Sequence, residues 1–159
     1  MKANSPACVV VADQGEARLY LLLPPASLRL IGRHENPAAL LHDRDLKSDR
    51  PGRVYNSAAA SGSRRGAMAH HATGGERTPR RQLATVFARQ IAGEIKAAAK
   101  AKAFDRLILV AEPRFLGTLR RALPATLRAK VAVQIAKDLM HLPSAQLRIR
   151  VAAATKGSR

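Results

Sequence analysis

Two carboxylates stand at places in the sequence where metal-dependent chemistry could be built. Asp13 follows the apolar run Ala7–Ala12, and Glu112 follows the run Phe104–Ala111. Such runs are typical of buried strands, and neighbouring parallel strands would bring both carboxylates to one end of a sheet. Nucleases that use two Mg²⁺ ions need carboxylates placed in this way. Both residues also fit structural roles, because Asp is favoured in turns and Glu112 precedes a helix that begins with Pro113. Asp13 and Glu112 are therefore the catalytic candidates.

Other residues with reactive side chains lack the spacing that their chemistry requires. His70 and His71 are adjacent and would point apart on a helix or a strand, so we expect them to be solvated or to face phosphate. Ser57, His70 and Asp49 have the residue types of a hydrolase triad, but no Gly-x-Ser-x-Gly turn accompanies them. No phosphate-binding Gly-x-Gly-x-x-Gly or Walker pattern occurs either. The sequence therefore predicts no metal site and no cofactor.

Charge is the strongest compositional signal in the chain. Its 159 residues include 28 Lys and Arg against 11 Asp and Glu, which gives a formal net charge of +17. Charge of this size points to acidic partners, such as nucleic acid, anionic lipid or an acidic protein. With 47% hydrophobic but only 3% aromatic residues, the chain can bury a core that must be mostly aliphatic.

A basic segment over residues 35–78 follows the third predicted strand. It lacks apolar periodicity and is rich in Gly and Ser, so we expect a long, partly mobile loop. Within it, the Arg50-Pro-Gly-Arg53 turn could hold two guanidinium groups for bidentate contacts with phosphate, and Tyr55 could stack on a base. Alternatively, Asp49 pairs with Arg53 and shapes the loop, or the loop is only a solvated surface.

A helix that begins at Pro79 carries the second group of basic residues. Apolar residues recur every four positions along this helix and predict one buried face. They are Leu83, Phe87, Ile91, Ile95 and Ala99, with Val86 and Ala98 alongside. Arg89, Lys96 and Lys100 share another face, and Arg80 and Arg81 oppose the helix dipole at its start. The predicted nucleic-acid or anion-binding residues are Arg50, Arg53, Tyr55, Arg64, Arg65, Arg80, Arg81, Arg89, Lys96 and Lys100.

The elements that must position these residues alternate in a βββαβαβα order. Three closely spaced strands favour an antiparallel meander, and two later strands that follow helices favour right-handed parallel crossovers. We therefore predict an α/β fold with a mixed, ribonuclease-H-like five-stranded sheet of order 3-2-1-4-5, with helices on both faces. Residues 1–159 form one domain, with residues 35–78 as a loop insertion. The predicted strands are Ala7–Ala12, Ala17–Leu23, Ser27–Arg33, Phe104–Ala111 and Lys130–Ala136, and the helices begin at Pro79, Pro113 and Pro143.

The sequence also bears on the compartment. Cys8, the single cysteine, lies in an apolar run, so we expect a buried and unreactive thiol. No apolar segment is long enough for a membrane span, and the N-terminal apolar run ends too soon at Asp13 for a signal peptide. These features predict a cytoplasmic protein.

Several segments resemble one family along most of the chain. They are Val10–Leu19, Asp49–Ser57, Phe104–Ala111, Phe115–Arg120 and Lys137-Asp138-Leu139, and they are similar to segments of the bacterial host-attachment proteins, described as required for attachment to host cells. The resemblance implies a distant relationship to the central domain of archaeal and eukaryotic peptide-chain release factors, which shares the predicted fold.

Three functions remain open on the sequence alone. The first is a non-enzymatic RNA- or ribosome-binding module that uses the basic loop and helix face. The second is an interaction protein in attachment to host cells, with an acidic polysaccharide or an acidic protein as its partner. The third is a Mg²⁺-dependent nuclease that uses Asp13 and Glu112.

Overall fold

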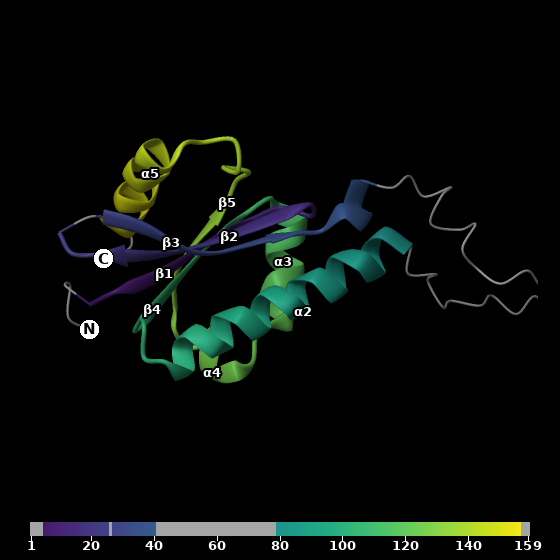
Figure 1. The fold of residues 1–159 in the computed structure, drawn as a ribbon, viewed down its shortest axis with the longest axis horizontal. Coiled ribbons are helices and arrows are strands. Elements are labelled where there is room, and N and C mark those ends of the chain that lie inside the picture. Colours follow the sequence, from purple (N-terminus) through teal and green to yellow (C-terminus); the bar gives the residue numbers. More distant parts are fainter. Residues whose placement is uncertain (1–4, 26, 41–78, 157–159) are drawn as a thin grey trace, which may run out of the picture.

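A single mixed sheet organises the protein in the computed structural model, which describes residues 5–25, 27–40 and 79–156 (Figure 1). Its strand order is β3-β2-β1-β4-β5, with β1–β2 and β2–β3 antiparallel and β1–β4 and β4–β5 parallel. The predicted α/β class, sheet and strand order are confirmed, while the closer likeness to ribonuclease-H folds stays a prediction. The elements are β1 (Ala7–Ala12), β2 (Glu16–Leu23), β3 (Ser27–Glu35), η1 (Pro37–Leu40), α2 (Pro79–Lys100), β4 (Arg106–Ala111), α3 (Pro113–Ala122), α4 (Ala125–Arg128), β5 (Val131–Ala136) and α5 (Ser144–Lys156).

The two central strands are buried on both faces, as their continuous apolar runs require. Every residue of β1 is buried, as is every residue of β4 after Arg106. Burial raises the pKa of the Cys8 thiol in β1 to about 12, so this cysteine stays protonated and unreactive at neutral pH.

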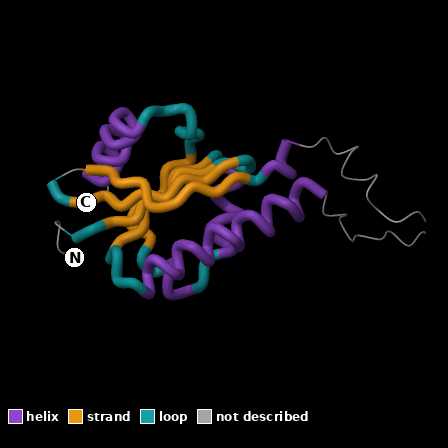
Figure 2. The backbone as a smooth tube through the Cα atoms, viewed as in Figure 1, coloured by secondary structure: helices purple, strands orange, loops and turns teal. Residues whose placement is uncertain are grey.

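Helices cover both faces of the sheet, also as predicted (Figure 2). Alternate residues of β1 and β4 pack on one face against α2 and α3, where Phe87, Ile91 and Phe115 are buried. The opposite face packs against α5, which buries Leu147 and Val151. None of the described helices is long and apolar enough to cross a membrane.

The structure differs from the prediction where elements are short or lie at a boundary. β3 continues to Glu35, which pairs with Glu16, and η1 follows within the predicted loop of residues 35–78. The helix α4 was not predicted, because four residues are too few to display helical periodicity. Residues 41–78, the remainder of that loop, lie outside the described residues.

One residue of the predicted buried face of α2 lies elsewhere. Val86 is 60% exposed, whereas Phe87 is 2% exposed. Successive residues of an α-helix are rotated by about 100°, so Val86 cannot share the narrow apolar arc around Phe87, Ile91 and Ile95. The prediction that Val86 lies beside the buried face is therefore wrong.

Candidate nucleic-acid interface

A row of three cations runs along the outward side of α2. Arg89, Lys96 and Lys100 are all exposed, and at helical spacing they fall within an arc of about 40°. The row is about 16 Å long at a rise of 1.5 Å per residue. The single acidic residue of α2, Glu94, lies more than about 100° from the row. We call Arg89, Lys96 and Lys100 the α2 row.

The packing of α2 on the hydrophobic core determines where the α2 row lies. The apolar side of α2 buries Phe87, Ile91 and Ile95 against the sheet, which directs the opposite side of the helix away from the protein. Figure 1 shows α2 below the sheet, on the side opposite α5. Within the described part of the chain, the predicted basic face of this helix is therefore exposed.

The two arginines predicted at the start of α2 are also exposed. Arg80 and Arg81 lie in the first turn, which contains no acidic residue, and α2 begins beside η1. Thr85 donates its hydroxyl to the backbone carbonyl of Arg81 at 2.8 Å, and Arg80 makes an interaction of its own. Both cations thus lie where residues 41–78 join the helix.

The remaining predicted binding residues lie outside the described part of the chain. These are Arg50, Arg53, Tyr55, Arg64 and Arg65, together with Asp49, Ser57, His70 and His71. Their predicted roles therefore stay predictions.

The two catalytic candidates lie at the same end of the sheet and take part in the β1–β2 turn. Ala12 and Ala111 are partners in the parallel β1–β4 pair, so Asp13 and Glu112 follow side by side. Asp13 Oδ1 accepts the backbone N–H groups of Gly15 and Glu16, each at 2.7 Å.

The side chain of Glu112 also has a hydrogen-bond partner in this turn. Gln14 Nε2 donates to Glu112 Oε1 at 3.2 Å. Among the described residues, no group of three His, Cys, Asp or Glu side chains could hold a metal ion. The geometry of both carboxylates therefore supports the structural interpretation that the sequence left open.

Replacing Asp13 tests this structural role. We expect Asp13→Ala to lower the free energy of unfolding by about 1–2 kcal/mol, because two backbone donors lose a charged acceptor. Urea denaturation measures the loss. Glu112→Gln keeps an acceptor for Gln14 and should change stability by less than about 0.5 kcal/mol. Equal stability of Asp13→Ala and the unaltered protein would contradict the assigned role.

A charged cluster on β2 and β3 was missed by the sequence analysis. Glu16 accepts from Arg18 Nε at 2.6 Å and from Arg33 Nε at 2.9 Å, and the hydrogen bond from Arg18 lowers the pKa of Glu16. Arg18 also donates to the backbone carbonyl of Met140 at 3.1 Å. The cluster thus ties the segment after β5 to the sheet. Its only sequence signal is the alternation of Glu16 and Arg18 along one strand.

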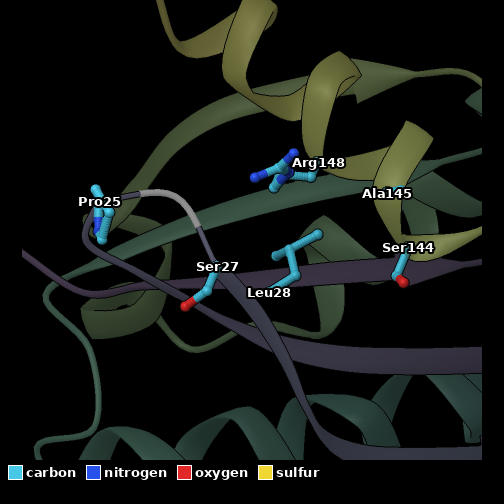
Figure 3. Close-up of a pocket in the computed structure, with 6 residues that line it drawn as sticks. All are labelled: Pro25, Ser27, Leu28, Ser144, Ala145 and Arg148. Atoms are coloured by element: carbon cyan, nitrogen blue, oxygen red, sulfur yellow. The ribbon is translucent and has the colours of Figure 1, made fainter.

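The structure also contains a hollow that the sequence did not indicate. A pocket of about 390 Å³ lies between the β2–β3 turn and the start of α5 (Figure 3). Because α5 covers the opposite face of the sheet from α2, this pocket is separate from the α2 row. Its lining residues are Pro25, Ser27, Leu28, Ser144, Ala145 and Arg148.

Two solved structures are similar in fold. The archaeal translation termination factor aRF1 matches with a TM-score of 0.45 and 10% identity, over 96% of this chain and 39% of that chain. A structure described as an archaeal protein matches with a TM-score of 0.44 and 11% identity, over 96% of this chain and 38% of that chain. The chain thus spans about two-fifths of the length of either structure.

The family itself is identified by sequence. A comparison with curated proteins gives no match. The model of the family described as "Protein required for attachment to host cells" matches residues 8–151. This range covers all five strands except for Ala7, and the four described α-helices as far as Val151 in α5. The resemblance found in the sequence is confirmed, and the chain belongs to the family of proteins required for attachment to host cells.

Proposed function

We propose that this protein is a non-enzymatic RNA-binding module that contacts phosphates through the α2 row. The observation that carries the proposal is the row itself: Arg89, Lys96 and Lys100 are exposed, closely aligned and opposite the buried side of the helix. A net charge of +17 adds a long-range attraction toward any polyanion. The partner is RNA, either free or within the ribosome. We also propose a cytoplasmic location, because such a partner is found there.

The basic residues outside the described part extend this proposal. Arg64 and Arg65 lie in the segment that joins η1 to α2, and so does the Arg50-Pro-Gly-Arg53 turn with Tyr55. This segment leads into α2 through Arg80 and Arg81, so its cations adjoin the row along the chain. We propose that they contact the same RNA.

The salt dependence of RNA binding tests the proposal. Each phosphate that a cation neutralises releases counterions, and the logarithm of affinity falls by about 0.7 per contact against the logarithm of salt concentration for single strands. Three contacts from the α2 row predict a slope of about −2 or steeper. Fluorescence anisotropy of a labelled RNA across a salt series measures it. A flat dependence would refute RNA binding through these cations.

A second candidate function is attachment through an acidic polysaccharide or an acidic protein. The description of the family favours it, and the same exposed cations would serve it. Tighter binding to an acidic polysaccharide than to RNA at equal anion concentration would favour this candidate. So would intact protein on the cell surface.

A Mg²⁺-dependent nuclease has less support than either binding function. Asp13 and Glu112 lie together, but the oxygen atoms described above already accept hydrogen bonds within the turn. Cleavage of a labelled RNA in Mg²⁺ that is absent in EDTA and in Asp13→Asn would establish this activity.

A further inference from the structure

The outward side of α5 carries an apolar side chain as well as the buried side. Leu147 and Val151 are buried against the sheet, whereas Ile149 is 63% exposed, more than any other large apolar side chain of the described residues. Ile149 lies about 160° around the helix from both buried residues, so it is on the side of α5 that faces away from the sheet. In a helix with one buried side, an apolar residue at this place has no partner within the described part of the chain.

Two alanines extend this apolar surface along the helix. Ala145 and Ala153 lie four residues before and after Ile149, and both are exposed. Each is within about 40° of Ile149, and the three residues span about 12 Å along the axis. We call Ala145, Ile149 and Ala153 the α5 face. Figure 1 shows α5 on the side of the sheet opposite α2, so the α5 face is separate from the α2 row.

Cations border the α5 face. Lys156 lies about 20° and Arg150 about 100° around the helix from Ile149. Both are exposed, and α5 contains no acidic residue. This border attracts a partner with negative charge and repels a second copy of this chain, which would bring the same cations. The α5 face therefore fits a partner with an apolar centre and acidic borders.

The apolar centre distinguishes this partner from RNA and from a membrane. Phosphate groups gain nothing from contact with Ile149, whereas an apolar side chain of a protein removes it from water. A single large apolar residue offers little area for insertion into lipid. An amphipathic helix presents a narrow apolar side with charged residues along it, and small residues such as Ala145 and Ala153 let two helices pack at about 8 Å.

We propose that the α5 face binds an acidic amphipathic helix of another protein. Ile149 packs among the apolar side chains of that helix, and Arg150 and Lys156 pair with its carboxylates. One helix lying on another makes a small contact, as is typical of transient complexes. This proposal goes beyond the proposed function, because it uses the other face of the sheet and does not require RNA binding.

Two synthetic peptides test the proposal. The probe is a fluorescein-labelled helical peptide of about 18 residues, with Leu and Ala along one side and Glu along the borders of that side. The comparison peptide has the same composition in scrambled order, so it keeps the charge and loses the apolar side. We expect fluorescence anisotropy with the full chain to show the amphipathic peptide binding about tenfold more tightly, because the net charge of +17 attracts both peptides alike.

Substitutions on α5 identify the surface that binds. Ile149→Gln should lower the affinity for the amphipathic peptide about fivefold to tenfold and leave that for the scrambled peptide within about twofold. Arg150→Gln with Lys156→Gln should lower it about fivefold and make its salt dependence shallower.

Val86→Gln is the matched control for Ile149→Gln. Val86 is also an exposed apolar residue, but it lies on α2, so this variant should keep the affinity for the amphipathic peptide within about twofold. Thermal melting should show every variant folded, since each altered side chain is exposed.

Four results would overturn the proposal. Equal or absent binding of the two peptides would mean that no apolar contact contributes. Equal losses in Val86→Gln and Ile149→Gln would place the peptide elsewhere on the protein. A dimer in analytical ultracentrifugation that Ile149→Gln abolishes would assign the α5 face to a second copy. A loss of affinity for labelled RNA in Ile149→Gln would assign it to RNA. None of the peptide measurements bears on RNA binding by the α2 row, so the proposed function stands or fails separately.

Discussion

We expect Phe115→Ala to lower the free energy of unfolding by about 3–5 kcal/mol, the largest loss of stability among the substitutions considered. Phe115 is 1% exposed and packs against Phe87, so it joins α3 to α2 as well as to the sheet. Removing the ring loses its transfer free energy and leaves a cavity that rigid neighbours close only in part. A loss of this size is a large fraction of the stability of a small domain.

Urea denaturation followed by circular dichroism measures the change. Phe115→Leu keeps most of the buried volume and should cost less than about 2 kcal/mol, which makes it the matched control. If Phe115→Ala costs less than about 1 kcal/mol, the ring is not packed between the two helices.

The largest expected change in binding follows from neutralising the α2 row. We expect Arg89→Gln, Lys96→Gln and Lys100→Gln together to lower RNA affinity by about tenfold to a hundredfold at low salt. The salt slope should become shallower by about two, since three phosphate contacts are lost. Thermal stability should stay nearly unchanged, because these side chains are exposed and lie outside the buried core.

A charge-preserving variant distinguishes the effect of losing positive charge from the effect of a general disturbance of the helix. This variant keeps the three positive charges and should retain most of the affinity for RNA. It combines Arg89→Lys, Lys96→Arg and Lys100→Arg. Anisotropy titrations of both triple variants at several salt concentrations provide the comparison. Unchanged affinity and slope in the glutamine variant would remove the α2 row from the interface.

The central strands were predictable because their signal is local and strong. β1 matches the predicted Ala7–Ala12, and β4 starts at Arg106, two residues inside the predicted Phe104–Ala111 run. A continuous apolar run can be satisfied only by burial on both faces, which requires a central position in the sheet. Right-handed crossovers then restrict the strand order to very few arrangements.

The edges of the sheet were harder to predict. Leu30 and Ile31 of β3 are 51% and 40% exposed, although both are apolar residues in a strand. The β2–β3 register shifts between Leu19 and Tyr20, which breaks the simple alternation of inward and outward side chains. An edge strand also lacks one neighbour, so the apolar character of a residue there does not ensure burial.

The amino-acid sequence alone determined the charge, the apolar stripe of α2 and the alignment of Arg89, Lys96 and Lys100 opposite it. These are local properties, because helical periodicity fixes which residues share a side. Only the tertiary structure decided that α3 packs on α2, through the contact of Phe87 with Phe115. It also brought Gln14 of the β1–β2 turn within hydrogen-bond distance of Glu112. Both facts depend on which elements meet in space, and the sequence patterns that predict each helix and strand do not specify those meetings.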